Sequence, residues 1–74
     1  MIKLHKVSKT RYESLDKRWT LEIEVWFLSR GKRRFWVLYD ALATPKYGHQ
    51  RVGAAMYNEA NALEKMLQQF SLEM

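Results

Sequence analysis

The stretch WTLEIEVWFLSRGKRRFWVLYD, residues 19–40, decides how this chain is expected to fold. Side chains alternate between the two faces of a β-strand, so a strand with one buried face carries apolar residues at every second position. From Trp19 to Leu28 the odd positions are all apolar, namely Trp19, Leu21, Ile23, Val25 and Phe27. A second apolar alternation, with Phe35, Val37 and Tyr39, runs from Arg33 to Tyr39. The stretch therefore predicts a β-hairpin over residues 19–39 with one core face.

The turn between the two strands sets the predicted register. Residues 29–31, Ser-Arg-Gly, fit a three-residue loop in which glycine takes the left-handed conformation. This loop predicts that Val25 lies opposite Phe35 and Ile23 opposite Val37, all on the core face. The other face would then carry Trp26, Arg34, Trp36 and Leu38, beside Glu22 and Glu24.

The flanking segments complete the predicted fold. Residues 2–12 alternate weakly and carry several lysines, which predicts an edge strand antiparallel to the first hairpin strand, joined to it by a turn at residues 14–18. A turn is expected at Thr44–Gly48, and apolar residues three and four apart predict one helix from about His49 to Phe70. The expected fold class is α+β, a single domain over residues 1–74 in which a three-stranded antiparallel sheet packs on one C-terminal helix.

This predicted order of three antiparallel strands followed by a helix resembles the small sheet-reading DNA-binding domains at the N-termini of some phage and transposon integrases. The resemblance rests on element order and carries over no functional residue. A small basic chain of this kind is also similar to many regulators encoded by phages or plasmids. The resemblance to integrase domains implies an expectation of DNA binding.

Composition limits the classes of function. The 74 residues include no cysteine, which excludes disulfides and thiolate metal sites and fits a cytoplasmic protein. No apolar run approaches the roughly 20 residues that span a bilayer, and residues 1–6 lack the apolar stretch of a signal peptide. The two histidines, His5 and His49, lie far apart, and no nucleophile motif or phosphate-binding glycine loop occurs. We therefore expect no enzyme, cofactor, metal site or membrane partner.

Positive charge is concentrated in the first half of the chain. Residues 1–34 contain ten Lys/Arg and four Asp/Glu, a net charge of +6, whereas residues 35–74 contain three and four, a net charge of −1. A one-sided positive field attracts polyanions such as nucleic acid or an acidic protein surface. A domain that is merely basic remains an alternative.

The densest cationic segment is the predicted hairpin tip, residues 30–34. It contains four cations, Arg30, Lys32, Arg33 and Arg34. A two-stranded ribbon can enter the DNA major groove, and its cations can contact phosphates. Lys17 and Arg18 belong to a wider basic spread that would extend this footprint. The alternative is a solvated basic turn.

Two tryptophans on a face that one helix cannot cover suggest an interface. Beside arginine, Trp26 and Trp36 suit stacking on unpaired bases, and they equally suit a protein hot spot. Glu22 and Glu24 on the same face count against nucleic acid. A further alternative is that Trp26 packs on Arg34 and only shields the sheet.

The sequence therefore predicts a small basic nucleic-acid-binding protein with a regulatory or accessory role, with DNA as the first expected ligand. The alternative is an inhibitor or adaptor that docks on an acidic protein partner through the tryptophan face. Homodimerisation is compatible with both functions and would help to stabilise so small a core.

Overall fold

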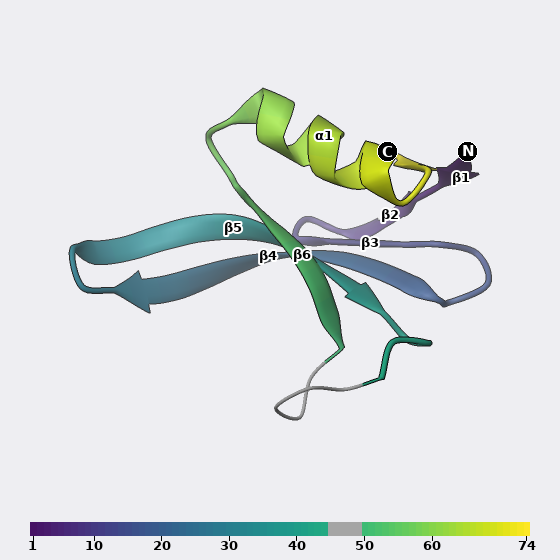
Figure 1. Cartoon of the computed structure of the whole chain (residues 1–74), viewed down its shortest axis with the longest axis horizontal. Helices are drawn as coiled ribbons and strands as arrows, with labels where there is room; N and C mark the ends of the chain where they lie inside the picture. Colours follow the sequence, from purple (N-terminus) through teal and green to yellow (C-terminus); the bar gives the residue numbers. More distant parts are fainter. Residues whose placement is uncertain (45–49) are drawn as a thin grey trace.

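The computed structural model describes residues 1–44 and 50–74, and its main element is one antiparallel sheet. Its five strands lie in the order β2-β3-β4-β5-β6. Their bounds are β2 (His5–Ser8), β3 (Arg11–Glu13), β4 (Trp19–Leu28), β5 (Gly31–Asp40) and β6 (Arg51–Met56). A parallel pair, β1 (Ile2–Lys3) with β7 (Leu72–Glu73), and one helix, α1 (Ala60–Gln69), complete the described chain (Figure 1).

The prediction of a three-stranded sheet is wrong. The expected N-terminal edge strand is divided into β1, β2 and β3; β3 pairs antiparallel with β4, as expected, but β2 forms the edge. The order on which the resemblance to integrase domains rested is therefore not the order of this chain. The expected turn at Thr44–Gly48 falls almost entirely on residues 45–49, which lie outside the described residues.

The predicted helix from about His49 to Phe70 is wrong in its first half, because residues 51–56 form β6 and pair with β5. Val52 and Met56 misled the prediction, since a spacing of four is even and fits the period of a strand as well as that of a helix. Gly53 was the contrary signal, because glycine in a helix costs about 1 kcal/mol relative to alanine. The helix begins only at Ala60 and is 10 residues long.

The predicted register of the hairpin is also wrong, by one residue. Leu28 pairs with Gly31 around a two-residue Ser29-Arg30 turn, so Ile23 lies opposite Trp36 and Leu21 opposite Leu38. A shift of one residue transfers a whole strand to the other face. The pattern did not decide between the registers because both faces of β5 are apolar: Phe35, Val37 and Tyr39 on one, Trp36 and Leu38 on the other.

The core lies between α1 and one face of the sheet, here called the helix-side face. Leu21 and Leu38 are fully buried on this face and belong to the same apolar cluster as Met66 and Leu67 of the helix. A Cβ atom at Gly53 would lie 2.9 Å from the Sδ atom of Met66, so glycine lets the helix approach β6 closely. The remaining members of the core cluster are Leu4, Trp19, Ala55 and Leu72.

Both ends of the chain lie beside the C-terminal end of α1 (Figure 1). Ser71 has a φ of 57°, a left-handed conformation typical of helix C-termini, and it turns the chain from α1 into β7. The Ile2 amide then donates to the Ser71 carbonyl at 2.9 Å, and the Leu4 amide donates to the Glu73 carbonyl at 2.7 Å. These bonds place Leu4 and Leu72 in the core.

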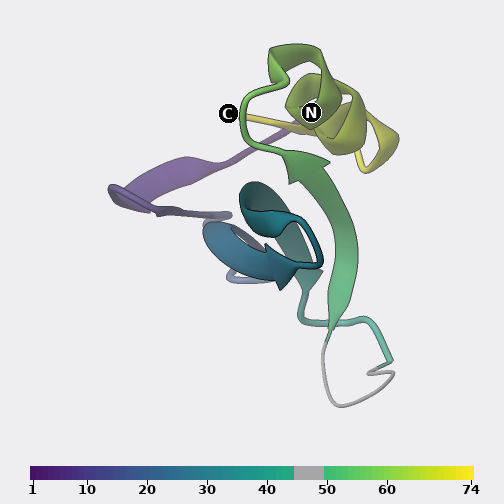
Figure 2. The same ribbon diagram turned by 90° about the vertical axis from the view of Figure 1, so that its left-hand side faces the viewer.

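The helix is much shorter than the strands that it covers. Ten residues span about 15 Å as a helix and about 33 Å as a strand. The β4–β5 hairpin accordingly extends past the helix along the long axis of the molecule (Figure 1). Seen from that end, the hairpin faces the viewer, with α1 above it and β2–β3 and β6 to either side (Figure 2). The outer half of the helix-side face is therefore left without a cover.

Candidate functional site

The projecting part of the hairpin, residues 25–34, is here called the distal hairpin. It combines exposed apolar and exposed cationic side chains in one segment. The side chain of Phe27 is 78% exposed and that of Val25 is 50% exposed, although both continue the core face of β4. By register, the helix-side face of the distal hairpin carries Val25, Phe27, Lys32 and Arg34. The opposite face of the sheet, here called the open face, carries Trp26, Leu28 and Arg33 in this segment.

Four cations of the distal hairpin make no ion pair with the described residues: Arg30, Lys32, Arg33 and Arg34. They are all exposed. As the sequence predicted, these four residues lie at the hairpin tip: Arg30 is in the turn, and Lys32, Arg33 and Arg34 are at the start of β5. Because no carboxylate neutralises them, this end of the hairpin is free to attract an anion.

On the helix-side face, the cations alternate with aromatic rings. The Lys32 Nζ atom lies 5.4 Å from the centroid of the Phe27 ring, and the Arg34 guanidinium carbon lies 5.1 Å from that of Tyr57. Tyr57 stacks on Trp36 with the ring centroids 5.7 Å apart. Tyr12 meets the other side of Trp36 edge-on at 5.9 Å. Trp36 is thus partly buried between two tyrosines, while Phe27 stands in solvent.

The open face uses its aromatic residues differently. Trp26 stacks on Phe35 with the ring centroids 4.4 Å apart, and the Arg51 guanidinium lies 4.8 Å from the Trp26 ring centroid. The indole Nε1 atom donates to Glu24 at 3.0 Å, and the Tyr39 hydroxyl donates to the same carboxylate. Burial, with a contribution from this hydrogen bond, raises the pKa of Tyr39 to about 12. Trp26 is therefore held on the open face by contacts with Phe35, Arg51 and Glu24.

The predicted tryptophan face does not exist, because Trp26 and Trp36 lie on opposite faces of the sheet. The same shift in register removes the two glutamates from the side of Trp36. Glu22 bonds Arg11 at 2.7 Å, and both it and Glu24 lie on the open face. On the helix-side face of β4 and β5, the one carboxylate is that of Asp40, at the far end from the tip.

Lys17 and Arg18, which the sequence suggested as an extension of the site, lie in the turn before β4, at the opposite end of that strand from the tip. Lys17 bonds Glu13 at 2.8 Å. Arg18 donates from Nε and Nη2 to the two oxygens of Asp40 at 2.9 and 3.1 Å. These hydrogen bonds hold the pKa of Asp40 below its usual 3.8. The structure thus separates both cations from the distal hairpin and engages them in the fold.

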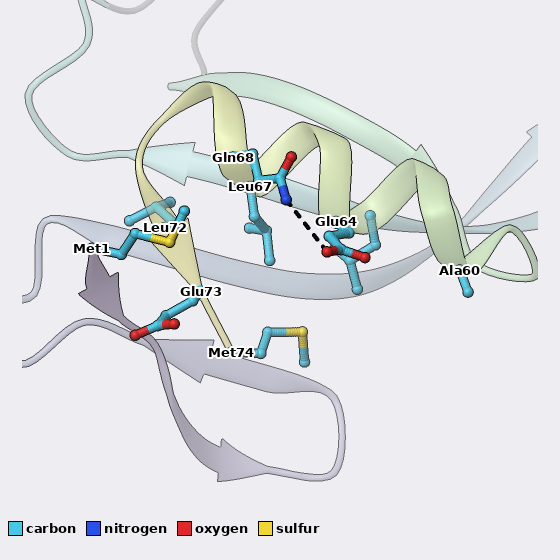
Figure 3. A pocket seen from close by; sticks show the side chains of 9 residues that line it. Met1, Ala60, Glu64, Leu67, Gln68, Leu72, Glu73 and Met74 are labelled. Atoms are coloured by element: carbon cyan, nitrogen blue, oxygen red, sulfur yellow. Dashed lines mark hydrogen bonds between the residues drawn. The ribbon is translucent and has the colours of Figure 1, made fainter.

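A second feature is a groove of about 300 Å³ between α1 and the C-terminal residues (Figure 3). It is largely apolar, but the carboxylates of Glu64 and Glu73 line it and no lysine or arginine does. Negative charge at its rim would repel a phosphate. Its lining residues are Met1, Ala60, Leu63, Glu64, Leu67, Gln68, Leu72, Glu73 and Met74. This groove is therefore not part of a polyanion site.

Among residues 1–44 and 50–74, no three histidine or acidic side chains are grouped so that they could hold a metal ion. No helix in this part of the chain has the length and apolar character needed to cross a bilayer. No family model, curated protein or solved structure matches this chain. The case for a function therefore rests on the distal hairpin itself.

Sequence reasoning missed the roles of Phe27, Tyr57 and Arg51. Phe27 was assigned to the buried face, and Tyr57 and Arg51 to a helix that does not exist there. The available signal was at the hairpin tip, where Phe27 is separated from the turn by a single residue. A side chain so close to the end of a ten-residue strand lies beyond the reach of a short helix.

Proposed function

We propose that this protein binds nucleic acid through the distal hairpin. The observation that carries the proposal is the set of four exposed cations, Arg30, Lys32, Arg33 and Arg34, without a carboxylate partner among the described residues. Phosphates supply the matching negative charge, and each neutralised phosphate releases counterions that favour binding.

The shape of the distal hairpin supports the same proposal. A two-stranded ribbon that projects from its domain can approach a nucleic acid without a clash from the rest of the molecule. Lys32 and Arg34 point to one side of the ribbon and Arg33 to the other, so cations are available to phosphates on both sides. The objection that Glu22 and Glu24 would repel phosphates is weakened, because neither lies on the side of Lys32 and Arg34.

The test is binding of a labelled oligonucleotide by the double variant Lys32→Glu/Arg33→Glu. We expect binding to be abolished at moderate salt, because two attractive contacts become repulsive. In the wild type, the logarithm of affinity should fall linearly with that of salt concentration, and neutralising Lys32 and Arg33 to alanine should lower the slope by about 2. The matched control is Lys6→Glu/Lys9→Glu, which changes the net charge equally at the β2–β3 edge of the sheet, away from the hairpin tip.

Each outcome has a defined meaning. Loss of binding in the tip variant and retention in the control support the proposed function. An equal loss of affinity in both variants would mean that the net charge of the protein, and not the distal hairpin, determines binding, which would contradict the proposal. Full binding by the tip variant would also contradict it. Circular dichroism spectra of all variants establish that the fold is retained.

A second candidate is docking on an acidic protein surface, and the exposed apolar side chains beside the cations favour it. The predicted contact surface of Trp26 with Trp36 is lost, but Val25, Phe27 and Leu28 offer another. Such hydrophobic contacts would make binding depend only weakly on salt, in contrast to phosphate binding. Homodimerisation remains a prediction under either function.

A further inference from the structure

The helix-side face of the distal hairpin combines the two features that single-stranded nucleic acid requires. The inference drawn here rests on the proposed function and narrows its ligand. Aromatic rings provide surfaces for unpaired bases, and neighbouring cations provide contacts for the backbone. Phe27 with Lys32 forms such a pair, and Arg34 adds a second cation one position further along the same face.

The exposure of Phe27 argues for a base as its partner. A phenylalanine ring that is 78% exposed contributes little to the fold and cannot bind a phosphate. In duplex nucleic acid the base faces are covered by stacking, so a protein reaches only the base edges and the backbone. In a single strand the faces are free, and stacking on an aromatic side chain tolerates every base.

Phe27 is the aromatic side chain of this face that is left free for a base. Further along the face, Trp36 and Tyr57 are stacked on each other and the Arg34 guanidinium lies over the Tyr57 ring. Val25 and Arg34 occupy the next position along the face from Phe27. On this face of β4 and β5 the one carboxylate is that of Asp40, at the far end from the tip, so none lies beside Lys32 and Arg34 to repel a phosphate.

We propose that this face binds single-stranded nucleic acid, with a base stacked on Phe27 and the adjoining phosphates held by Lys32 and Arg34. The open face does not provide an equivalent surface. There Trp26 is already stacked on Phe35 and covered by Arg51. Nothing in the arrangement selects ribose or deoxyribose, so DNA and RNA single strands share the chemistry.

The test compares fluorescence anisotropy of three labelled probes at low and physiological salt: oligo-dT and oligo-U of about 15 nucleotides, and a DNA duplex of equal length. We expect tighter binding to the single strands. The variant Phe27→Ala should lose about tenfold in affinity for single strands and little for duplex. Phe27→Tyr, which keeps the ring, should restore single-strand binding. The two single strands distinguish DNA from RNA as the preferred ligand.

Leu15→Ala is the matched control, because Leu15 is equally exposed, at 81%, but lies in the turn at the other end of β4. It should bind every probe like the wild type. Tighter binding to duplex, or no loss on Phe27→Ala, would overturn the single-strand inference and leave the proposed function intact. Failure of the wild type to bind any probe at low salt would overturn both.

Discussion

The two halves of the β4–β5 hairpin share the same antiparallel backbone pairing but differ in how deeply their side chains are buried. In the half next to the chain termini, Leu21 and Leu38 pair on the helix-side face and are fully buried. In the distal half, Val25 and Phe27 continue the same face and stand half to three-quarters in solvent. On β4 the apolar alternation is the same in both halves, so the difference in burial of its side chains arises from what covers each half.

The cover is the helix, and its length sets the boundary. A helix of about 15 Å cannot protect strands of about 33 Å. The buried half therefore contributes its apolar side chains to the core, whereas the apolar side chains of the distal half remain exposed. The exposed apolar side chains of the distal half add nothing to a core that is already small. Exposed apolar patches of this kind usually mark interaction surfaces.

The largest expected effect is on the buried half. Leu38→Ala removes a fully buried side chain from the core cluster and should lower the free energy of unfolding by about 2–5 kcal/mol. A domain of this size has little more stability than that, so much of the variant should be unfolded. Urea denaturation followed by circular dichroism measures the loss. Val25→Ala, on the same face in the distal half, should cost less than about 1 kcal/mol. Equal losses would show that the helix-side face is protected along its whole length.

An intermediate effect is expected at Asp40, which anchors the end of the buried half. Its pKa in the folded state lies below 3.8 because Arg18 donates two hydrogen bonds to the ionised carboxylate. The ionised form therefore contributes stability in full above pH 3.8, and this contribution is lost as the pH falls through the lower folded-state pKa. Asp40→Asn should cost about 1 kcal/mol at neutral pH, since Arg18 remains partly solvated.

The same substitution provides its own pH control. The difference in unfolding free energy between wild type and Asp40→Asn should shrink progressively below pH 3.8. Urea titrations at neutral pH and at several acidic values measure it. A difference that stays constant over this range would mean that the carboxylate charge contributes nothing to folding.

The smallest effect on stability is expected at the tip of the distal half. Phe27→Ala should change the free energy of unfolding by less than about 0.5 kcal/mol, because the ring is mostly in solvent. The urea midpoint should match that of the wild type at every protein concentration. A marked loss of stability that depends on protein concentration would instead indicate that Phe27 is buried between two copies of the chain. The contrast between this variant and Leu38→Ala separates the exposed half of the hairpin from the buried half.

Local patterns in the sequence were sufficient for the hairpin and for its cationic tip. The alternation of apolar and polar residues from Trp19 to Val25 is typical of a strand, and Gly31 with its neighbours marks the reversal of the chain. The four tip cations lie within five consecutive residues, 30–34, so any hairpin that turns there would bring them together. The turn at residues 14–18 was also correct, and it is stabilised by the Ser14 hydroxyl, which donates to Asp16 at 2.6 Å.

Only the tertiary structure decided three features of the sheet. These are the register of β4 with β5, the pairing of β6 with β5, and the placement of Trp26 and Trp36 on opposite faces. Both faces of β5 are apolar, so the choice between them depends on which face the helix covers, a contact between residues distant in sequence. Residues 51–56 fit both periodicities, and their pairing with β5 made them a strand. Local sequence determines which segments alternate and where charge gathers, but the length of the helix on the folded sheet determined which aromatic residues stay buried and which remain free to bind.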